Sequence, residues 1–387
     1  MIRKPLPTSY LNSRSEWLLL ELITLKPESS KEKETFDKLM KSNGLNWGEL
    51  LEQALRHKIL PLLAFDTTSN QFIETLPKLV RRHLRTTLDL NKYNNTILYN
   101  EAARIIKILE SQDVRFVGTK GITLESTIYN NNGSRRLGDM DFMVLPKYRN
   151  VITRTMSQLG YQMGGFNWST YKVRPLNREE KTIFKLNPDH LPHFIKLTED
   201  PVVPFVDVDF ANSLTWTRSP FNVPIEDALA EIVYQPIPGI SDVQMPCFNS
   251  KFQFIFTILH LFREAWVFRE GWVDTINDGW ETDVTLSKFA DVIRLWKAYE
   301  KELNTPEFIQ ILEKYEIMNP ILWVLEHTDR TFNTNILPTL GLEGRVTEEW
   351  LHSAGGLGGK LIQWKGTMRE RLYCKDRRKL FITDSEN

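Results

Sequence analysis

The sequence predicts an α+β fold, with a small mixed β-sheet between an N-terminal and a C-terminal helical region. Apolar residues recur at helical spacing before residue 112 and again beyond residue 250. Between these regions, short β-rich runs alternate with helical segments, an order typical of a sheet with associated helices. The chain has 387 residues, and single hydrophobic cores stop growing at roughly 250 to 300 residues. We therefore expect two or three structural units.

The N-terminal region, residues 1–92, is expected to be helical. The helix that begins at Trp47 has Asn46 as its N-cap residue and ends near Pro61. The C-terminal region, residues 236–387, has the same helical texture. The clearest helical segments of the two regions are Glu16–Leu25, Trp47–Leu55, Leu76–Leu90, Phe252–Phe262, Leu286–Leu303 and Glu307–Tyr315.

The middle of the chain, residues 93–235, is expected to hold the sheet. A helix over Asn94–Gln112 leads into a short strand and a glycine-containing turn, Gly118–Gly121. The last predicted strand contains Pro204, which interrupts it because proline has no N–H group for the ladder. The remaining predicted elements are strands at Val114–Val117, 138–144, Tyr161–Met163, His193–Leu197 and Val202–Phe210, and helices at Ile122–Tyr129 and Asn150–Leu159.

Composition excludes some classes of partner and compartment. Lys plus Arg equals Asp plus Glu at 49 each, so no overall field attracts nucleic acid or an anionic membrane. The chain has two cysteines, and the single disulfide that they could form would not be the main stabilising feature of a protein this large. We therefore expect free thiols in a reducing compartment. The sequence has no signal peptide and no apolar run long enough for a membrane span. We expect a cytoplasmic protein.

The segment Gly138–Val144 carries two carboxylates one residue apart. Side chains alternate faces along a strand, so Asp139 and Asp141 should project to one side while Met140 and Phe142 enter the core. Two like charges this close raise each other's pKa unless a cation lies between them. The simplest candidate is Mg²⁺, a hard ion that binds carboxylate oxygens and substrate phosphates.

Two further features of the central region suit the same chemistry. The turn at Lys120 and Gly121 opens a helix, and the N–H groups at a helix N-terminus favour phosphate. A later strand carries Asp207 and Asp209, which are two residues apart and therefore face the same side. The order is a phosphate-facing turn, an acidic strand and a second acidic strand.

These residues resemble the DNA polymerase β-like nucleotidyltransferase superfamily, and within it the branch of uncharacterised family-5 nucleotidyltransferases. The resemblance is carried by Val117–Leu124, which is similar to the branch's lysine-glycine turn, and by Arg135–Val144, which is similar to its arginine-led acidic strand. It covers most of residues 45–300. The resemblance implies a nucleotidyltransferase core at residues 93–235.

The resemblance also implies site residues and cofactors. Mg²⁺ or Mn²⁺ would be the metal in a two-metal mechanism, and a nucleoside triphosphate such as ATP would be the co-substrate. Where this chain has Asp209, the branch more often has histidine, so Asp207 and Asp209 are both candidates for the third carboxylate; Asp207 is favoured because it stands where the family has its acid. The implied residues are Asp139, Asp141 and Asp207 for catalysis, the same three with Asp209 for the metal, and Gly118, Thr119, Lys120, Gly121 and Arg135 for the nucleotide.

The acceptor is left open by the sequence. A hydroxyl on a small molecule or a peptide, for example in natural-product biosynthesis, suits the neutral charge balance better than a nucleic acid. The alternatives are a toxin-like enzyme that modifies tRNA or a protein, a phosphotransferase using the same site, and a degenerate nucleotide-binding protein. Arg135 could equally form a structural salt bridge. His190 and His193 have a metal-like spacing, but no cysteine or acid cluster completes a zinc site.

Overall fold

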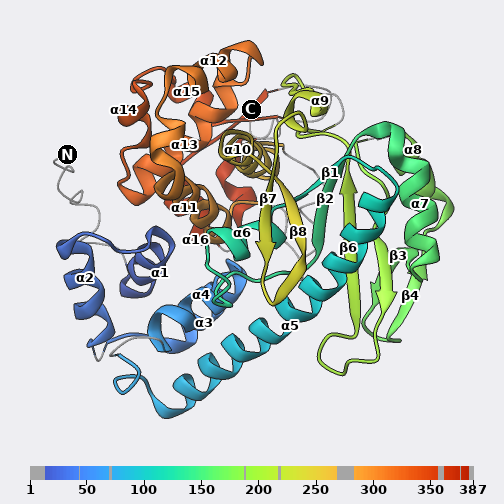
Figure 1. The fold of residues 1–387 in the computed structure, drawn as a ribbon. Helices are drawn as coiled ribbons and strands as arrows, with labels where there is room; N and C mark the ends of the chain where they lie inside the picture. Colours follow the sequence, from blue (N-terminus) through green and yellow to red (C-terminus); the bar gives the residue numbers. More distant parts are fainter. Residues whose placement is uncertain are drawn as a thin grey trace. The chain divides into compact units, whose positions relative to one another are not determined.

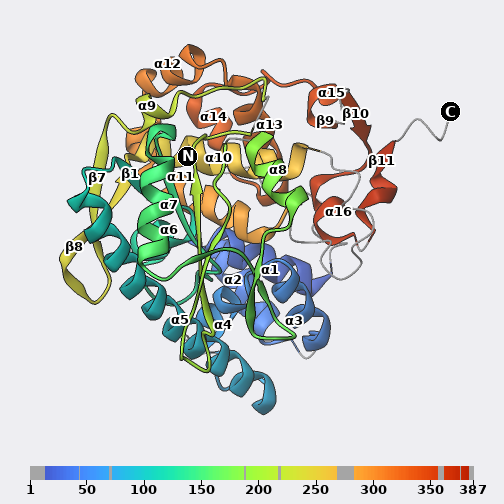
Figure 2. The same ribbon diagram turned by 90° about the vertical axis from the view of Figure 1, so that its right-hand side faces the viewer.

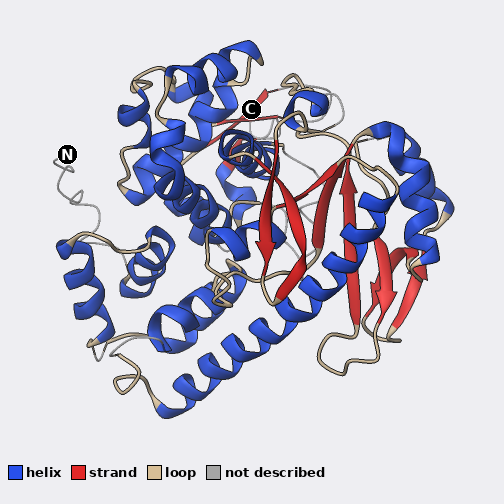
Figure 3. Ribbon diagram, in the orientation of Figure 1, coloured by secondary structure: helices blue, strands red, loops and turns tan. Residues whose placement is uncertain are grey.

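The computed structural model describes residues 14–42, 44–68, 72–186, 189–216, 219–267, 283–355, 361–374 and 376–382. The chain divides into two compact units: residues 1–82 together with 254–387 form unit 1, and residues 83–253 form unit 2. Figures 1 and 3 show the elements by label and by type. Unit 1 is mainly helical and unit 2 holds the large sheet. The predicted α+β class is confirmed. The division into three domains at residues 92 and 235 stays a prediction.

The helices of unit 1 include those that the periodicity predicts, together with α2, which it does not predict. Helix α2 begins with a capping box, in which Ser29 accepts a hydrogen bond from the Glu32 N–H and Glu32 accepts one from Ser29. Asn46 caps α3 as predicted. The helices are α1 Ser15–Leu25, α2 Ser30–Met40, α3 Trp47–Arg56, α4 Leu60–Thr68, α11 Leu286–Leu303, α12 Pro306–Lys314, α13 Met318–Phe332, α14 Ile336–Leu340, α15 Glu348–Leu351 and α16 Met368–Tyr373.

Unit 1 also contains a three-stranded antiparallel sheet of β9 (Ser353–Gly355), β10 (Leu361–Trp364) and β11 (Phe381–Ile382), with β10 in the middle. Two long helices contain the sequence boundaries between the units. Helix α10 is Ser250–Trp266, and α5 is Lys78–Ser111. The sequence leaves open whether the helices predicted at Leu76–Leu90 and Asn94–Gln112 are separate or continuous. They form one helix, α5, because no glycine or proline interrupts its 34 residues.

The sheet of unit 2 has eight strands in the order β4-β3-β5-β6-β2-β1-β8-β7. Strand β2 is parallel to β6 and β1 is parallel to β8, while the other neighbours are antiparallel. The strands are β1 Phe116–Thr119, β2 Met140–Val144, β3 Gln162–Asn167, β4 Lys172–Pro175, β5 Phe194–Leu197, β6 Phe205–Ala211, β7 Ile232–Ile237 and β8 Ile240–Phe248.

One face of this sheet is covered by α5 and α7. Apolar side chains of α5, such as Ile106, and of α7, such as Met156, share one buried cluster with Phe142 of β2 and Phe210 of β6. Figure 2 shows α7 beside the strands. The charged residues that the sequence singles out are therefore left for the other face. The remaining helices are α6 Gly121–Thr127, α7 Arg149–Gln158, α8 Arg178–Leu186, α9 Ile225–Ala228 and the 3-10 turn η2 Pro146–Tyr148.

Several predicted boundaries differ from the structure, and two of them lie near the charged residues of the sheet. Strand β6 begins at Phe205 rather than at Val202, because Pro204 has no N–H group to donate to the ladder. Gly118 and Thr119, which the sequence places in a turn, are the last residues of strand β1. The turn is therefore confined to Lys120, which precedes α6.

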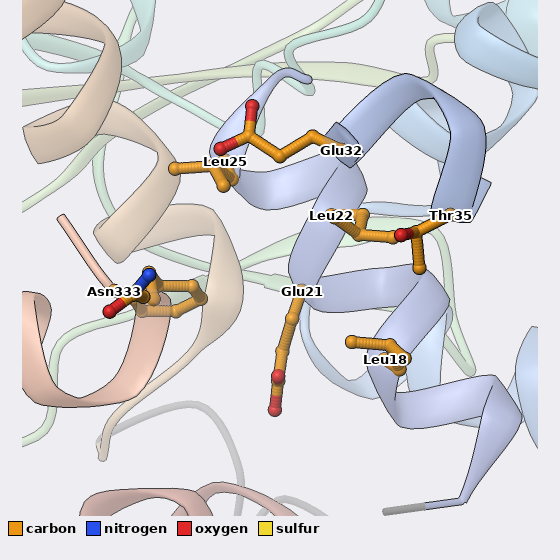
Figure 4. A pocket seen from close by; sticks show the side chains of 8 residues that line it. Leu18, Glu21, Leu22, Leu25, Glu32, Thr35 and Asn333 are labelled. Atoms are coloured by element: carbon orange, nitrogen blue, oxygen red, sulfur yellow. The ribbon is translucent and has the colours of Figure 1, made fainter. Parts of the chain in front are cut away.

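Unit 1 also contains a pocket. It is lined in part by the Glu21 carboxylate, which accepts hydrogen bonds of 2.7 and 2.8 Å from Arg369. Measured against the ~20 apolar residues that a bilayer crossing requires, each helix in the described parts of the chain is too short or too polar. Figure 4 shows the pocket, whose lining is Leu18, Glu21, Leu22, Leu25, Glu32, Thr35, Phe332 and Asn333.

Candidate active site

The turn between β1 and α6 holds Lys120 in an unusual backbone conformation. Its φ is +52° and its ψ is −131°, a combination that costs a residue with a side chain about 1–3 kcal/mol. The turn is also tightly packed, since a Cβ atom on Gly121 would lie 2.9 Å from the Leu137 side chain. Strain of this kind is commonly retained where it aims a functional side chain.

Strands β2 and β6 bring the two acidic pairs together. They are parallel, with Met140 opposite Val208 and Asp141 opposite Asp209. Met140, Phe142, Val208 and Phe210 are fully buried in the core, as alternation predicts. Asp141 and Asp209 therefore share the other face. Asp139 and Asp207 come one residue before Met140 and Val208, so all four carboxylates gather at this parallel pair.

Lys120 forms an ion pair with Asp141. The pairing follows from the strands: β1 is antiparallel to β2 with Thr119 opposite Asp141, so the next residue, Lys120, stands beside that carboxylate. Burial disfavours the Lys120 ammonium, but the carboxylates of Asp141, Asp139 and Asp209 outweigh it and raise the pKa of Lys120 above its usual value. Lys120 is a cation held at the acidic cluster.

The pKa of Asp141 and the pKa of Asp209 are shifted in opposite directions. Burial, followed by repulsion from Asp139, raises the pKa of Asp141 to about 7 despite Lys120. Burial also acts on Asp209, but the hydrogen bond and charge of His190, together with Lys120, outweigh it and lower the Asp209 pKa. At Asp141, burial and the neighbouring carboxylates therefore outweigh the one cation, Lys120. At Asp209, the neighbouring cations outweigh burial.

Each acid of β6 has a histidine partner. His193 Nδ1 lies 2.9 Å from Asp207 Oδ1, and His190 Nδ1 lies 3.2 Å from Asp209 Oδ2. The hydrogen bond to Asp207 raises the pKa of His193 to about 9. Burial raises the pKa of Asp207, which His193 opposes. The sequence spacing of the two histidines suggests at most a zinc pair. Their carboxylate partners follow from the pairing of β5 with β6 and of His190 with Ala211, at the end of β6.

The loop that leads to Asp139 is fixed by side chains that the sequence analysis did not single out. The Glu125 carboxylate of α6 accepts hydrogen bonds from the backbone N–H groups of Gly133 and Arg135, at 2.7 and 3.0 Å. Three asparagines of α5 donate to carbonyl oxygens of the same loop. They are Asn91 to Gly133 and Arg135, Asn95 to Arg135, and Asn94 to Leu137. The run Asn91, Asn94, Asn95 at helical spacing was the available signal, since asparagine is a poor helix former.

Three of the residues predicted to bind the nucleotide have backbone or core contacts. Gly118 is buried in β1, opposite Phe142. Thr119 is also buried, and its hydroxyl donates to the Asp141 carbonyl oxygen at 3.3 Å. The Arg135 guanidinium donates to the neighbouring Arg136 carbonyl oxygen at 2.8 Å. The residues that the structure brings together are therefore Lys120 and the four acids.

The donor set suits a hard divalent ion, because carboxylate oxygens are the ligands that Mg²⁺ and Mn²⁺ prefer. Burial and then repulsion from Asp139 raise the pKa of Asp141, so a cation bound beside Asp141 would favour its charged form. As the side chains stand, no three Asp, Glu, His or Cys residues among those described converge into a ready-made metal cage. Three of the acids have cationic or histidine partners instead. Lys120 pairs with Asp141, His190 with Asp209 and His193 with Asp207.

The sequence was compared with protein families and with curated proteins. A family model described as an uncharacterised nucleotidyltransferase matches residues 43–333, which contain the β1–α6 turn and both acidic strands. No curated protein matches the chain. Because the family model spans well over half of the sequence, the chain belongs to this family of uncharacterised nucleotidyltransferases.

Proposed function

We propose that this protein is a divalent-metal-dependent transferase that moves a nucleoside monophosphate from a nucleoside triphosphate to a hydroxyl of a small-molecule or peptide acceptor. The single observation that carries the proposal is the gathering of four carboxylates at the parallel pair β2 and β6, with Asp141 opposite Asp209 and Lys120 beside Asp141. The family membership supports transfer of a nucleotide in general.

In this proposal Lys120 and the turn before α6 hold the triphosphate. The ammonium of Lys120 has its charged form stabilised by the surrounding acids, and a cation at this point can pair with phosphate oxygens. Asp139, Asp141 and Asp207 would hold Mg²⁺ or Mn²⁺, with Asp209 as a further ligand. Bound there, the metal ions would offset the charge of the triphosphate and stabilise the leaving oxygen.

Transfer needs an acceptor oxygen to form a bond to the α-phosphorus while pyrophosphate leaves. The proton of the acceptor hydroxyl must be accepted by a nearby base, and Asp207 is our assignment. Its side chain is 22% exposed, whereas that of Asp209 is 8% exposed. His193 would keep Asp207 oriented through their 2.9 Å contact.

The test measures metal-dependent binding and turnover of each of the four nucleoside triphosphates. We expect at least one triphosphate to bind to the wild-type protein by calorimetry in the presence of Mg²⁺ and not in EDTA. Asp141→Asn should reduce pyrophosphate release by about 10²-fold or more. Asp242→Asn is the matched control, because Asp242 is an exposed acid on β8 of the same unit.

Two outcomes would contradict the proposal. Equal triphosphate affinity with Mg²⁺ and with EDTA would show that the carboxylates do not bind the triphosphate through a metal ion. An acceptor product that gains the mass of one phosphate rather than one nucleotide would identify a phosphotransferase, because the attack would then have occurred at the γ-phosphorus.

A further inference from the structure

A cluster of four aromatic side chains lies at the hairpin of β3 and β4. Phe166, Trp168 and Tyr171 come from the hairpin, and Phe205 is the first residue of β6. Trp168 is 63% exposed and Tyr171 is 60% exposed. Single exposed apolar residues are common on protein surfaces. A contiguous exposed patch of large apolar side chains, in contrast, often marks a ligand-binding or interaction site.

The rings are held in a defined arrangement. Phe166 stacks on Phe205 with ring centroids 4.1 Å apart and planes 15° apart. Trp168 meets Phe166 and Phe205 edge-on, at 5.0 and 5.6 Å. The planes of Trp168 and Tyr171 are 82° apart, with centroids separated by 6.2 Å. The two exposed rings therefore form a corner over a stacked pair, a shape that can receive the face and the edge of another planar ring.

The cluster is continuous with the acidic site. Phe205, Asp207 and Asp209 alternate with the buried residues Val206 and Val208, so they share one face of β6. Phe205 precedes Asp207 by two residues, which is about 7 Å along a strand. A molecule on the aromatic cluster could therefore reach the carboxylates without leaving this face.

The position of the cluster in the sheet separates it from Lys120. In the strand order, β4, β3 and β5 lie beyond β6, whereas β1, which leads into Lys120, lies beyond β2 on the opposite side. The carboxylates lie between the two. If the triphosphate occupies the Lys120 side, the aromatic side is where an acceptor would approach Asp207.

We infer that the cluster of Phe166, Trp168, Tyr171 and Phe205 binds an aromatic ring of the acceptor, and that the ring lies within about 10 Å of the hydroxyl that receives the nucleotide. The inference rests on the proposed function, and it narrows the acceptor to a hydroxyl compound with a planar aromatic group. A neutral acceptor fits better than a polyanion, because the chain has no net positive charge.

The experiment uses saturation-transfer NMR on the full chain with three probes. The tripeptide amide Ser-Gly-Trp and the small alcohol 2-(indol-3-yl)ethanol both carry an indole and a hydroxyl, and the tripeptide amide Ser-Gly-Ala lacks the ring. We expect saturation of the indole protons by the wild-type protein, and a signal at least threefold lower for Trp168→Ala and Tyr171→Ala. Trp168→Phe should retain most of it. The relative signal of the two indole probes distinguishes a peptide from a small-molecule acceptor.

Tyr234→Ala is the matched control, since Tyr234 is 54% exposed on β7 at the other end of the sheet. Circular dichroism should show all the variants folded. Equal indole signals for the wild type and Trp168→Ala would overturn the inference, and so would a dimer of the wild type that Trp168→Ala abolishes in sedimentation. Calorimetry with Mg²⁺ and each of the four nucleoside triphosphates on the same samples keeps the two proposals apart. If none of the four binds to the wild type, the proposed function is refuted, whereas unchanged triphosphate binding in Trp168→Ala is expected.

Discussion

Two buried aspartates, one in each unit, show how similar burial can serve different ends. Asp283 in unit 1 and Asp141 in unit 2 are 3% and 4% exposed. Burial acts against the charged form of both, but Arg371 and Arg377 outweigh it at Asp283 and lower its pKa. At Asp141 burial and Asp139 together outweigh Lys120, and the pKa rises to about 7.

The difference lies in how the neighbouring charges are matched. Asp283 accepts a 2.7 Å hydrogen bond from Arg371 and lies 2.9 Å from Arg377, so its charge is balanced within unit 1. Asp141 shares one lysine with other carboxylates, since Asp139 and Asp209 both act on the same group. Removing one partner from a buried ion pair is strongly destabilising, whereas pKa values perturbed by burial and neighbouring like charges are common at functional sites.

Breaking the balanced pair should have the largest effect on stability. Arg371→Leu would remove a side chain that is fully buried and leave Asp283 with one partner instead of two. We expect a loss of about 3–5 kcal/mol in the free energy of unfolding, because the buried Asp283 carboxylate and the Ala265 carbonyl oxygen each lose a hydrogen bond from Arg371. Urea unfolding followed by circular dichroism measures it.

The control for this prediction is Arg330→Leu. Arg330 pairs with Glu326 and Glu348, but its side chain is 47% exposed, and exposed pairs contribute about 1 kcal/mol or less. Equal losses for the two variants would show that the burial of the Asp283 cluster is not what makes it stabilising.

A smaller loss of stability is expected when the contacts of Glu125 with the loop before Asp139 are changed. Glu125→Gln would replace a carboxylate that accepts the N–H groups of Gly133 and Arg135 by an amide with a single acceptor oxygen. One buried N–H group would lose its partner, which costs about 1–3 kcal/mol. We expect the urea midpoint and the affinity for Mg²⁺ with triphosphate to fall together, because the loop carries the chain toward Asp139.

Glu179→Gln is the control for the loop, since Glu179 is exposed on α8. If Glu125→Gln weakened triphosphate binding no more than Glu179→Gln does, the contacts of Glu125 with the loop would have no part in positioning the acids.

The sequence predicted the parts of this arrangement that local patterns encode. Alternation along Met140–Val144 placed Met140 and Phe142 in the core, and the spacing of Asp207 and Asp209 put them on one face. What it could not predict depends on which strands become neighbours. The pairing of Asp141 with Asp209, of Asp207 with His193, and of Glu125 with the loop joins residues that are 68, 14 and 8 to 10 positions apart.

The aromatic cluster was missed for the same reason. Phe166 and Phe205 stack across two elements that no periodicity links. The sequence also did not predict the backbone conformation of Lys120. A positive φ is expected at glycine, and the pattern assigned the turn to Gly118–Gly121.

The smallest predicted effect has the opposite sign. Asp139→Asn would remove one of the causes that raise the pKa of Asp141. An acid whose pKa is higher in the folded than in the unfolded state loses stability as pH rises from its ordinary value of 3.8 toward about 7. The variant should lose less, and at pH 8 we expect it to be more stable than the wild type by about 1 kcal/mol, the equivalent of a pKa difference near one unit. At pH 4 the two proteins should differ little. Asp242→Asn, which removes an exposed acid paired with Lys107, should show no gain at pH 8.

The Asp139→Asn variant should also lose its response to Mg²⁺. An ion that binds only the folded state adds to its stability, so Mg²⁺ should raise the urea midpoint of the wild type. It should not raise that of Asp139→Asn, in which a proposed metal ligand is missing. A variant that gains stability while it loses the response to Mg²⁺ would show that the excess charge at Asp141 is retained for binding. A variant that is less stable at pH 8 would show that Asp139 is part of a balanced network, like the one around Asp283.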